Sequence, residues 1–166
     1  MAGIAWCCFL VYNVNTLANK VVGIMTGIIL PDQKKLEDIF EKYNLPAVYL
    51  FGSRVGGTAT SGSDYDFGIL LNEAADFEEA ALFEMNVAEE LSGVLEQKAD
   101  IVILNSASIE LKFLIIKRGI LIYSGNDDQR TDFEDMTIRD YLDFKPVLDT
   151  YRKEVRESIK GGGFYG

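Results

Sequence analysis

The stretch from residue 47 to residue 71, AVYLFGSRVGGTATSGSDYDFGILL, decides how this chain can fold. Its first five residues form an apolar run of strand length that ends at Gly52. Gly56, Gly57 and Gly62 make the residues that follow typical of a loop. The run from Asp64 to Leu71 then has the length and apolar character of another strand. The stretch therefore predicts two strands joined by a glycine-rich loop.

The segments around this stretch alternate between helical and extended patterns. Pro31 opens a helix that runs to Tyr43 with its apolar residues on one face. Further along, the pattern predicts a helix over 77–95 with Gly93 near its end, a strand over 98–104, a helix from Ser106 or Ser108 to Arg118, and a short strand over 120–123. The acidic and aromatic segment 126–160 predicts one or two helices broken at Pro146. This order predicts an α+β (α/β-like) domain with a mixed sheet of about four strands flanked by helices.

The length of 166 residues fits one domain, and 48% hydrophobic residues with 25% charged residues are typical of a globular protein. We divide the chain into an uncertain apolar leader (1–30), a core (31–125), a C-terminal helical segment of the same domain (126–160) and a flexible glycine-rich tail (161–166). No repeat or interdomain linker interrupts the pattern. One domain with extensions at both ends is the expected organisation.

The leader carries a single charge, Lys20, and its apolar run over residues 4–12 is too short to cross a bilayer. It also lacks the basic region and the cleavage site of a signal peptide. Two interpretations stay open: a strand covered by a partner, or residues upstream of a true start at Met25. Natively expressed protein whose intact mass begins at Met1 would exclude the second interpretation.

Composition excludes several classes of chemistry. The sequence has no histidine, which removes Ser-His-Asp and Cys-His mechanisms and nearly every zinc site. Its two cysteines, Cys7 and Cys8, are adjacent and cannot link distant segments, so a cytosolic location is expected by default. The formal net charge of −10 would repel a phosphate backbone, which makes nucleic acid an unfavourable main partner. Carboxylate chemistry is what remains.

Three aspartates stand at positions where burial alone would be unfavourable. Residues two apart on a strand point to the same face about 7 Å apart at Cα, so Asp64 and Asp66 can converge on one cation. Asp100 begins another apolar strand, and the three carboxylates meet if the two strands are neighbours. Oxygen ligands without His or Cys favour Mg²⁺ or Mn²⁺ over zinc. The alternative is that these aspartates are ordinary turn residues.

Gly52 and Ser53 end a strand and open a short helix, where free backbone N–H groups favour an anion such as a triphosphate. A side chain at Gly52 would keep the backbone away from the phosphates. Arg54 could contact phosphate or pair with surface carboxylates. The sequence thus predicts a phosphate site beside a metal site.

The pattern Gly52-Ser53, ten residues, Asp64, one residue, Asp66, with Asp100 on a later strand, resembles the signature of the polymerase-β-like nucleotidyltransferase superfamily. The form LFGSR...G...SDYDFGILL is similar to its minimal nucleotidyltransferase (MNT) branch, which includes the MntA antitoxins paired with HEPN toxins. The resemblance covers roughly residues 31 to 151 and leaves out the leader and the tail.

This resemblance implies a role for each motif residue. Gly52 and Ser53 would hold the β- and γ-phosphates of ATP, with Arg54 as a further candidate. Asp64 and Asp66 would ligate two Mg²⁺ ions, and Asp100 would ligate the second ion and help activate an acceptor hydroxyl.

The implied function is transfer of AMP from ATP to a tyrosine of a HEPN toxin by an antitoxin, and the acidic surface suits a basic ribonuclease partner. Transfer to a small molecule of the aminoglycoside type, an antitoxin that acts by binding alone, and addition to RNA ends stay open as alternatives. The acceptor, the nucleotide, the number of AMP groups and the oligomeric state are not determined by the sequence.

Overall fold

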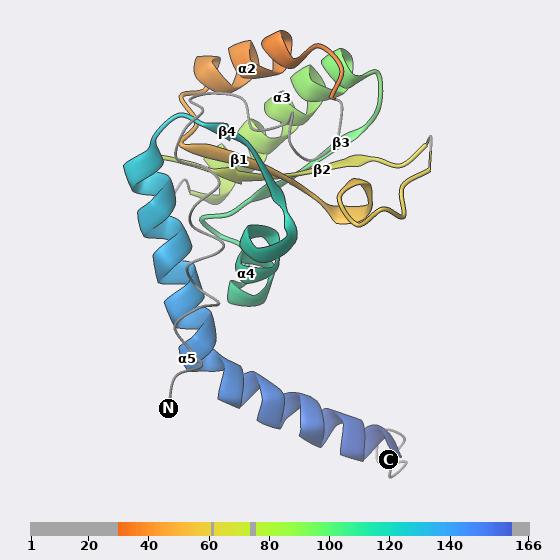
Figure 1. Cartoon of the computed structure of the whole chain (residues 1–166), viewed down its shortest axis with the longest axis vertical. Helices are drawn as coiled ribbons and strands as arrows, with labels where there is room; N and C mark the ends of the chain where they lie inside the picture. Colours follow the sequence, from red (N-terminus) through yellow and green to blue (C-terminus); the bar gives the residue numbers. More distant parts are fainter. Residues whose placement is uncertain (1–29, 61, 74–75, 161–166) are drawn as a thin grey trace, which may run out of the picture.

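A computed structural model of the chain describes residues 30–60, 62–73 and 76–160. The expectations for the leader, for a start at Met25 and for the tail therefore lie outside the described residues. The elements are, in chain order, α2 (Gln33–Lys42), β1 (Ala47–Phe51), the short 3-10 helix η1 (Gly52–Arg54), β2 (Tyr65–Leu70), α3 (Phe77–Leu95), β3 (Ala99–Ile103), α4 (Ile109–Arg118), β4 (Ile120–Ser124) and α5 (Asp127–Lys160) (Figure 1). Each predicted helix and strand of the core is present within a few residues of its predicted bounds.

The four strands form one sheet in the order β3-β2-β1-β4. Strand β1 lies in the middle and pairs antiparallel with both β2 and β4. The β2–β3 pair is parallel, and helix α3 makes the crossover between the two strands. The sheet is therefore mixed, and the predicted α+β class is confirmed.

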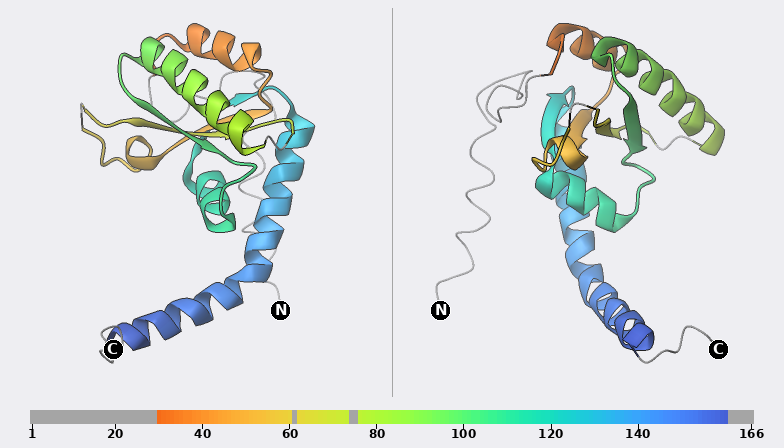
Figure 2. Two further views of the ribbon diagram at one scale, coloured as in Figure 1. Left: turned by 180° about the vertical axis from the view of Figure 1, so that it is seen from behind. Right: turned by 90° about the vertical axis from the view of Figure 1, so that its right-hand side faces the viewer.

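Helices cover both faces of the sheet (Figure 2). Strand residues that alternate along β1, β2 and β3 pack on α2 and α3; this core includes Phe40, Val48, Leu50, Phe67, Ile69, Val87 and Leu91. On the opposite face, residues of β1 and β2 pack with Leu104 and with Ile115 of α4; this second core also includes Ala47, Tyr49 and Leu70. The sheet is thus buried on both sides, which explains its nearly continuous apolar strands.

Local capping explains where two of the helices begin. The side chain of Asp76 accepts from the backbone N–H of Glu79 at 2.9 Å at the start of α3. Of the two predicted caps for α4, Ser108 is the one used, and it accepts from the N–H of Leu111 at 3.3 Å. Helix α3 continues through Gly93 to Leu95.

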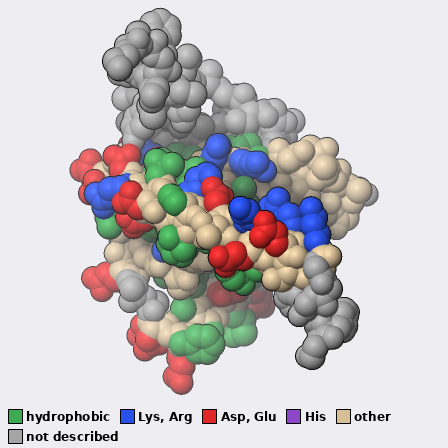
Figure 3. Space-filling view, turned by 90° about the horizontal axis from the view of Figure 1, so that it is seen from below, with side chains coloured by type: hydrophobic (Ala, Val, Ile, Leu, Met, Phe, Trp, Pro, Cys, Tyr) green, Lys and Arg blue, Asp and Glu red, His purple; other side chains and the backbone are tan. Residues whose placement is uncertain are grey.

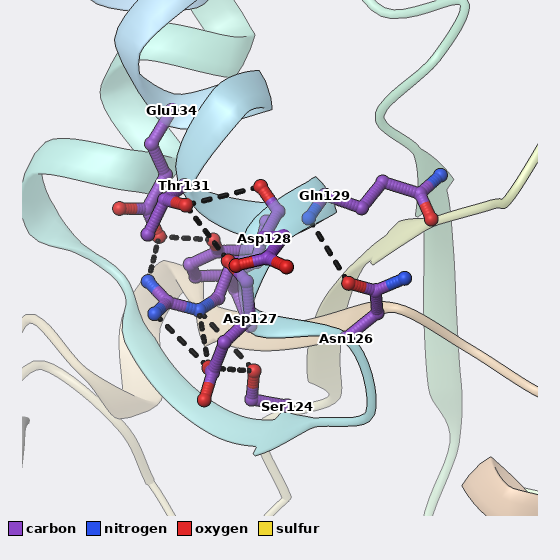
Figure 4. Close-up of polar contacts among 9 residues, drawn as sticks. Ser124, Asn126, Asp127, Asp128, Gln129, Thr131 and Glu134 are labelled. Carbon is purple, nitrogen blue, oxygen red and sulfur yellow. Dashed lines mark hydrogen bonds and ion pairs between the residues drawn. The ribbon is translucent and has the colours of Figure 1, made fainter.

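A polar network fixes the first turns of α5 to the sheet (Figure 4). The buried hydroxyl of Tyr49 donates to Glu134 at 2.6 Å, and burial raises the pKa of Tyr49 far above its ordinary value. Arg130 donates to Glu134 at 2.9 Å and to Asp127 at 3.1 Å, and Ser124 donates to Asp127 at 2.6 Å. Strands β1 and β4 are thereby connected to α5 by hydrogen bonds to charged groups.

The predicted break at Pro146 is wrong: α5 is one helix of 34 residues with Pro146 inside it. The helix bends about halfway along its length (Figure 1). Proline removes one backbone hydrogen bond and its ring crowds the preceding turn, so a bend is the milder of its two possible effects. Before the bend, Tyr141 stacks on Phe113 of α4 with ring centroids 3.8 Å apart. None of the described helices is long and apolar enough to span a membrane.

Candidate active site

The predicted carboxylates lie together at one end of the sheet. Asp66 of β2 and Asp100 of β3 are register partners on neighbouring parallel strands. Asp64 lies two residues before Asp66, directly ahead of β2. Strand β1 ends at the same place, because Phe51 is the register partner of Asp66. The turn η1 therefore begins beside the carboxylates, at the end of the sheet away from α5 (Figure 1).

Gly52 is required by its contact with Asp66. Its φ of +75° lies in the left-handed region that disfavours residues with a side chain. A Cβ added there would lie 1.9 Å from Oδ2 of Asp66 and 2.7 Å from its Cγ. The backbone of η1 thus approaches the carboxylate more closely than any other residue type would permit.

Arg54 holds the chain that carries Asp64. Its Nε donates to the backbone oxygens of Ser63 at 3.1 Å and Asp64 at 3.2 Å. Its guanidinium also contacts Gln97 and stacks over the ring of Tyr65, with Cζ 3.6 Å from the ring centroid. These donors are directed at protein acceptors, so the phosphate contact expected for Arg54 stays a prediction. Its place in the described structure is that of a clamp between η1 and the start of β2.

The family model described as polymerase beta, nucleotidyltransferase matches residues 34–128. This match spans more than half of the chain and contains η1 and all four strands. The chain belongs to this nucleotidyltransferase family.

Solved structures show the same fold. A toxin–antitoxin crystallised with AMP-PNP is 24% identical, with a TM-score of 0.64 over 75% of this chain and 98% of that chain. A complex of an AMPylated HEPN toxin with an MNT antitoxin from Shewanella oneidensis is 21% identical, with a TM-score of 0.59 over 75% of this chain and 95% of that chain. A comparison with curated proteins finds no match. At these identities the likeness establishes the nucleotidyltransferase fold.

The carboxylates of this nucleotidyltransferase crowd one another. The pKa of Asp66 is raised above its ordinary value, first by partial burial and then by the charges of Asp100 and Asp64. Asp64 and Asp100 are more open, with side chains 45% and 46% exposed. A cluster of carboxylates of this kind favours a neighbouring cation.

Lys98 supplies a positive charge that the sequence interpretation missed. Its Nζ lies 2.6 Å from Oδ1 of Asp100 and 3.7 Å from Oδ2 of Asp64. The ammonium offsets part of the rise in the pKa of Asp66, and the hydrogen bond to Asp100 raises the pKa of Lys98 itself. A signal was available in the sequence, because Lys98 stands two residues before Asp100 and so projects from the same face of an extended chain.

The side chains of Asp64, Asp66 and Asp100 are of a chemical type that can bind a divalent cation. The donors are carboxylate oxygens, which suit Mg²⁺ or Mn²⁺, and the missing side chain of Gly52 lets the Asp66 carboxylate lie directly against η1. As the described side chains stand, however, no three of their carboxylates form a ready-made ligand set. The assignment of Asp64, Asp66 and Asp100 as metal ligands therefore stays a prediction, and in the described geometry the Lys98 ammonium lies close to Asp64 and Asp100.

Proposed function

We propose that this protein transfers AMP from ATP to an acceptor hydroxyl in a Mg²⁺-dependent reaction, and that the acceptor is a tyrosine of a HEPN toxin that the protein silences as an antitoxin. The observation that carries the proposal is the pairing of Asp66 with Asp100 in register, with Gly52 pressed against Asp66. Membership of the nucleotidyltransferase family supports the reaction class. A structure of a tri-AMPylated HEPN toxin with an MNT antitoxin, which shares the fold, supports the acceptor.

The roles proposed for the residues are those that the resemblance to nucleotidyltransferases implies, and the grouping of these residues at the end of the sheet supports them. Asp64 and Asp66 would hold both Mg²⁺ ions, and Asp100 would hold the second one. Mg²⁺, when bound, neutralises phosphate charge and lowers the pKa of a hydroxyl. Backbone N–H groups around Gly52 and Ser53 would orient the β- and γ-phosphates, since the chain approaches the carboxylates closely there.

In the proposed transfer the acceptor hydroxyl would give its proton to Asp100, and its oxygen would form a bond to the α-phosphorus of ATP. The bond from the α-phosphorus to the bridging oxygen of the β-phosphate breaks, and pyrophosphate leaves. The product is an AMP ester of the acceptor, so each transfer adds one phosphate charge to the target protein.

Charge favours a protein acceptor over nucleic acid. The chain has a formal net charge of −10, which suits a basic partner. The face seen in Figure 3 mixes acidic, basic and hydrophobic side chains and presents no continuous basic stripe. We include a cytosolic location in the proposal, since ATP and Mg²⁺ are available there.

The test is intact-mass analysis of a purified HEPN toxin after incubation with this protein, ATP and Mg²⁺. We expect a gain of about 329 Da for each AMP added, because transfer at the metal site leaves one nucleotide on the acceptor. Asp66→Asn and Asp100→Asn should abolish the gain, and Asp38→Asn on the exposed side of α2 is the matched control that should retain it. Toxin neutralisation without any gain in mass would reject the proposed chemistry in favour of an antitoxin that acts by binding. AMP transfer to an aminoglycoside but not to the toxin would reject the proposed acceptor.

A further inference from the structure

Lys98 places a positive charge beside two of the three carboxylates in the site. Its ammonium contacts Asp100 at 2.6 Å and Asp64 at 3.7 Å, so it links the carboxylates of a strand residue and a preceding loop residue. The backbone oxygen of Lys98 accepts from the N–H of Tyr65 at 2.9 Å, which fixes the base of its side chain to the start of β2. The lysine is thus anchored beside the cluster at its backbone and reaches into the cluster with its charge.

We propose that Lys98 is a built-in counter-cation that compensates the charges of Asp64 and Asp100 and must leave when a divalent cation binds to them. The inference rests on the proposed function only in taking these aspartates as metal ligands. It assigns Lys98 as a positioning residue that competes with the metal.

Two features make this exchange physically reasonable. The side chain of Lys98 is 64% exposed, so its ammonium can return to water without crossing a packed core. An exposed ion pair is also weak, which means that a dication with several carboxylate ligands can displace it. The Lys98 ammonium offsets part of the repulsion among the carboxylates, which contributes to the raised pKa of Asp66, and a bound dication would take over that role.

The proposal predicts that removing Lys98 strengthens metal binding, whereas removing a residue that only supports the structure of the site would weaken it. Lys98→Met removes the competing charge and retains most of the stem, so the variant should bind Mn²⁺ more tightly than the parent protein. The expected gain is about two- to fivefold, the factor associated with breaking an exposed ion pair. Lys98→Arg retains the charge and should bind Mn²⁺ within about twofold of the parent.

The experiment is a titration of the full-length protein with Mn²⁺ in the absence of nucleotide, with free Mn²⁺ followed by electron paramagnetic resonance. The matched control is Lys35→Met on α2, because Lys35 is also paired with an aspartate, Asp32, and its side chain is 66% exposed. Both substitutions to methionine change the net charge by the same amount, so any general effect of charge appears in both. A double variant, Asp66→Asn/Asp100→Asn, should lose the Mn²⁺ ion bound at this site, so the lost part of the titration reports on this site alone.

The proposal is supported if Lys98→Met alone binds Mn²⁺ more tightly and if that advantage shrinks at high salt, where the exposed ion pair is already screened. Equal or weaker binding by Lys98→Met would overturn it, as would equal gains in Lys98→Met and Lys98→Arg. Undiminished Mn²⁺ binding by the double variant would also overturn it, because the cation position would then lie elsewhere. Since no nucleotide or toxin is present, failure of AMP transfer would reject the proposed function without affecting this result.

Discussion

Replacing Gly52 by alanine tests the contact on which the site is built. The substitution adds one methyl group at a residue with φ of +75°, directly against the carboxylate of Asp66. An alanine held in the left-handed region costs about 1–2 kcal/mol in backbone strain. The new Cβ would lie 1.9 Å from Oδ2 and 3.1 Å from Cβ of Asp66, so rotation of the carboxylate alone cannot relieve the overlap. Forcing Asp66 off its rotamer adds about 0.5–1.5 kcal/mol.

A matched control separates the two contributions. Gly57 lies in the same loop with φ of +73°, and a Cβ added there meets nothing within 4 Å. Gly57→Ala therefore carries the backbone strain without the overlap. We expect it to lose about 1–2 kcal/mol of unfolding free energy, whereas Gly52→Ala should lose about 1.5–3.5 kcal/mol. At this chain length the additional loss in Gly52→Ala corresponds to a further decrease in Tm of about 1–6 °C.

The assay combines urea unfolding, followed by circular dichroism, with Mn²⁺ titration of both variants. Gly52→Ala should weaken Mn²⁺ binding by about tenfold or more, because displacement of Asp66 moves a carboxylate that we propose as a metal ligand. Gly57→Ala should leave Mn²⁺ binding unchanged. If both variants lose the same stability and bind Mn²⁺ equally well, the approach of η1 to Asp66 has no role in the site.

Three further outcomes follow from described contacts. Arg54→Gln should weaken AMP transfer by about tenfold while the fold is retained, because the clamp over Tyr65 positions the start of β2; unchanged kcat and KM would reject the clamp. The hydroxyl of Ser124 lowers the pKa of Asp127, so the stability that this carboxylate contributes is present above its unfolded pKa, about 3.9, and is lost as pH falls through its folded value. In urea unfolding, the advantage of the parent over Asp127→Asn should thus be full at pH 7 and reduced at pH 3; an equal advantage at both would contradict the pairing. Pro146→Ala should straighten α5 and increase the maximum dimension measured by small-angle X-ray scattering, whereas an unchanged dimension would assign the bend to another cause.

Much of the fold was predictable because its signals are local. Helix α3 has the predicted bounds, 77–95, since its periodicity and its cap at Asp76 lie within the segment itself. The strands are short apolar runs bounded by glycine or polar residues, which places them within one or two residues. Pro146 was misjudged because a helix that is long enough on both sides of a proline can bend and continue.

The sequence by itself determined which groups are available to the site: carboxylates without histidine, Asp64 two residues before Asp66, and a glycine next to a strand end. These features depend only on residue type and on the two-residue period with which side chains alternate along a strand. Only the tertiary structure decided that β3 lies parallel to β2 with Asp100 opposite Asp66, and that the Lys98 ammonium lies between Asp64 and Asp100. Strand order and register arise from packing between segments far apart in the chain, and no local pattern encodes which side chains such packing brings into contact.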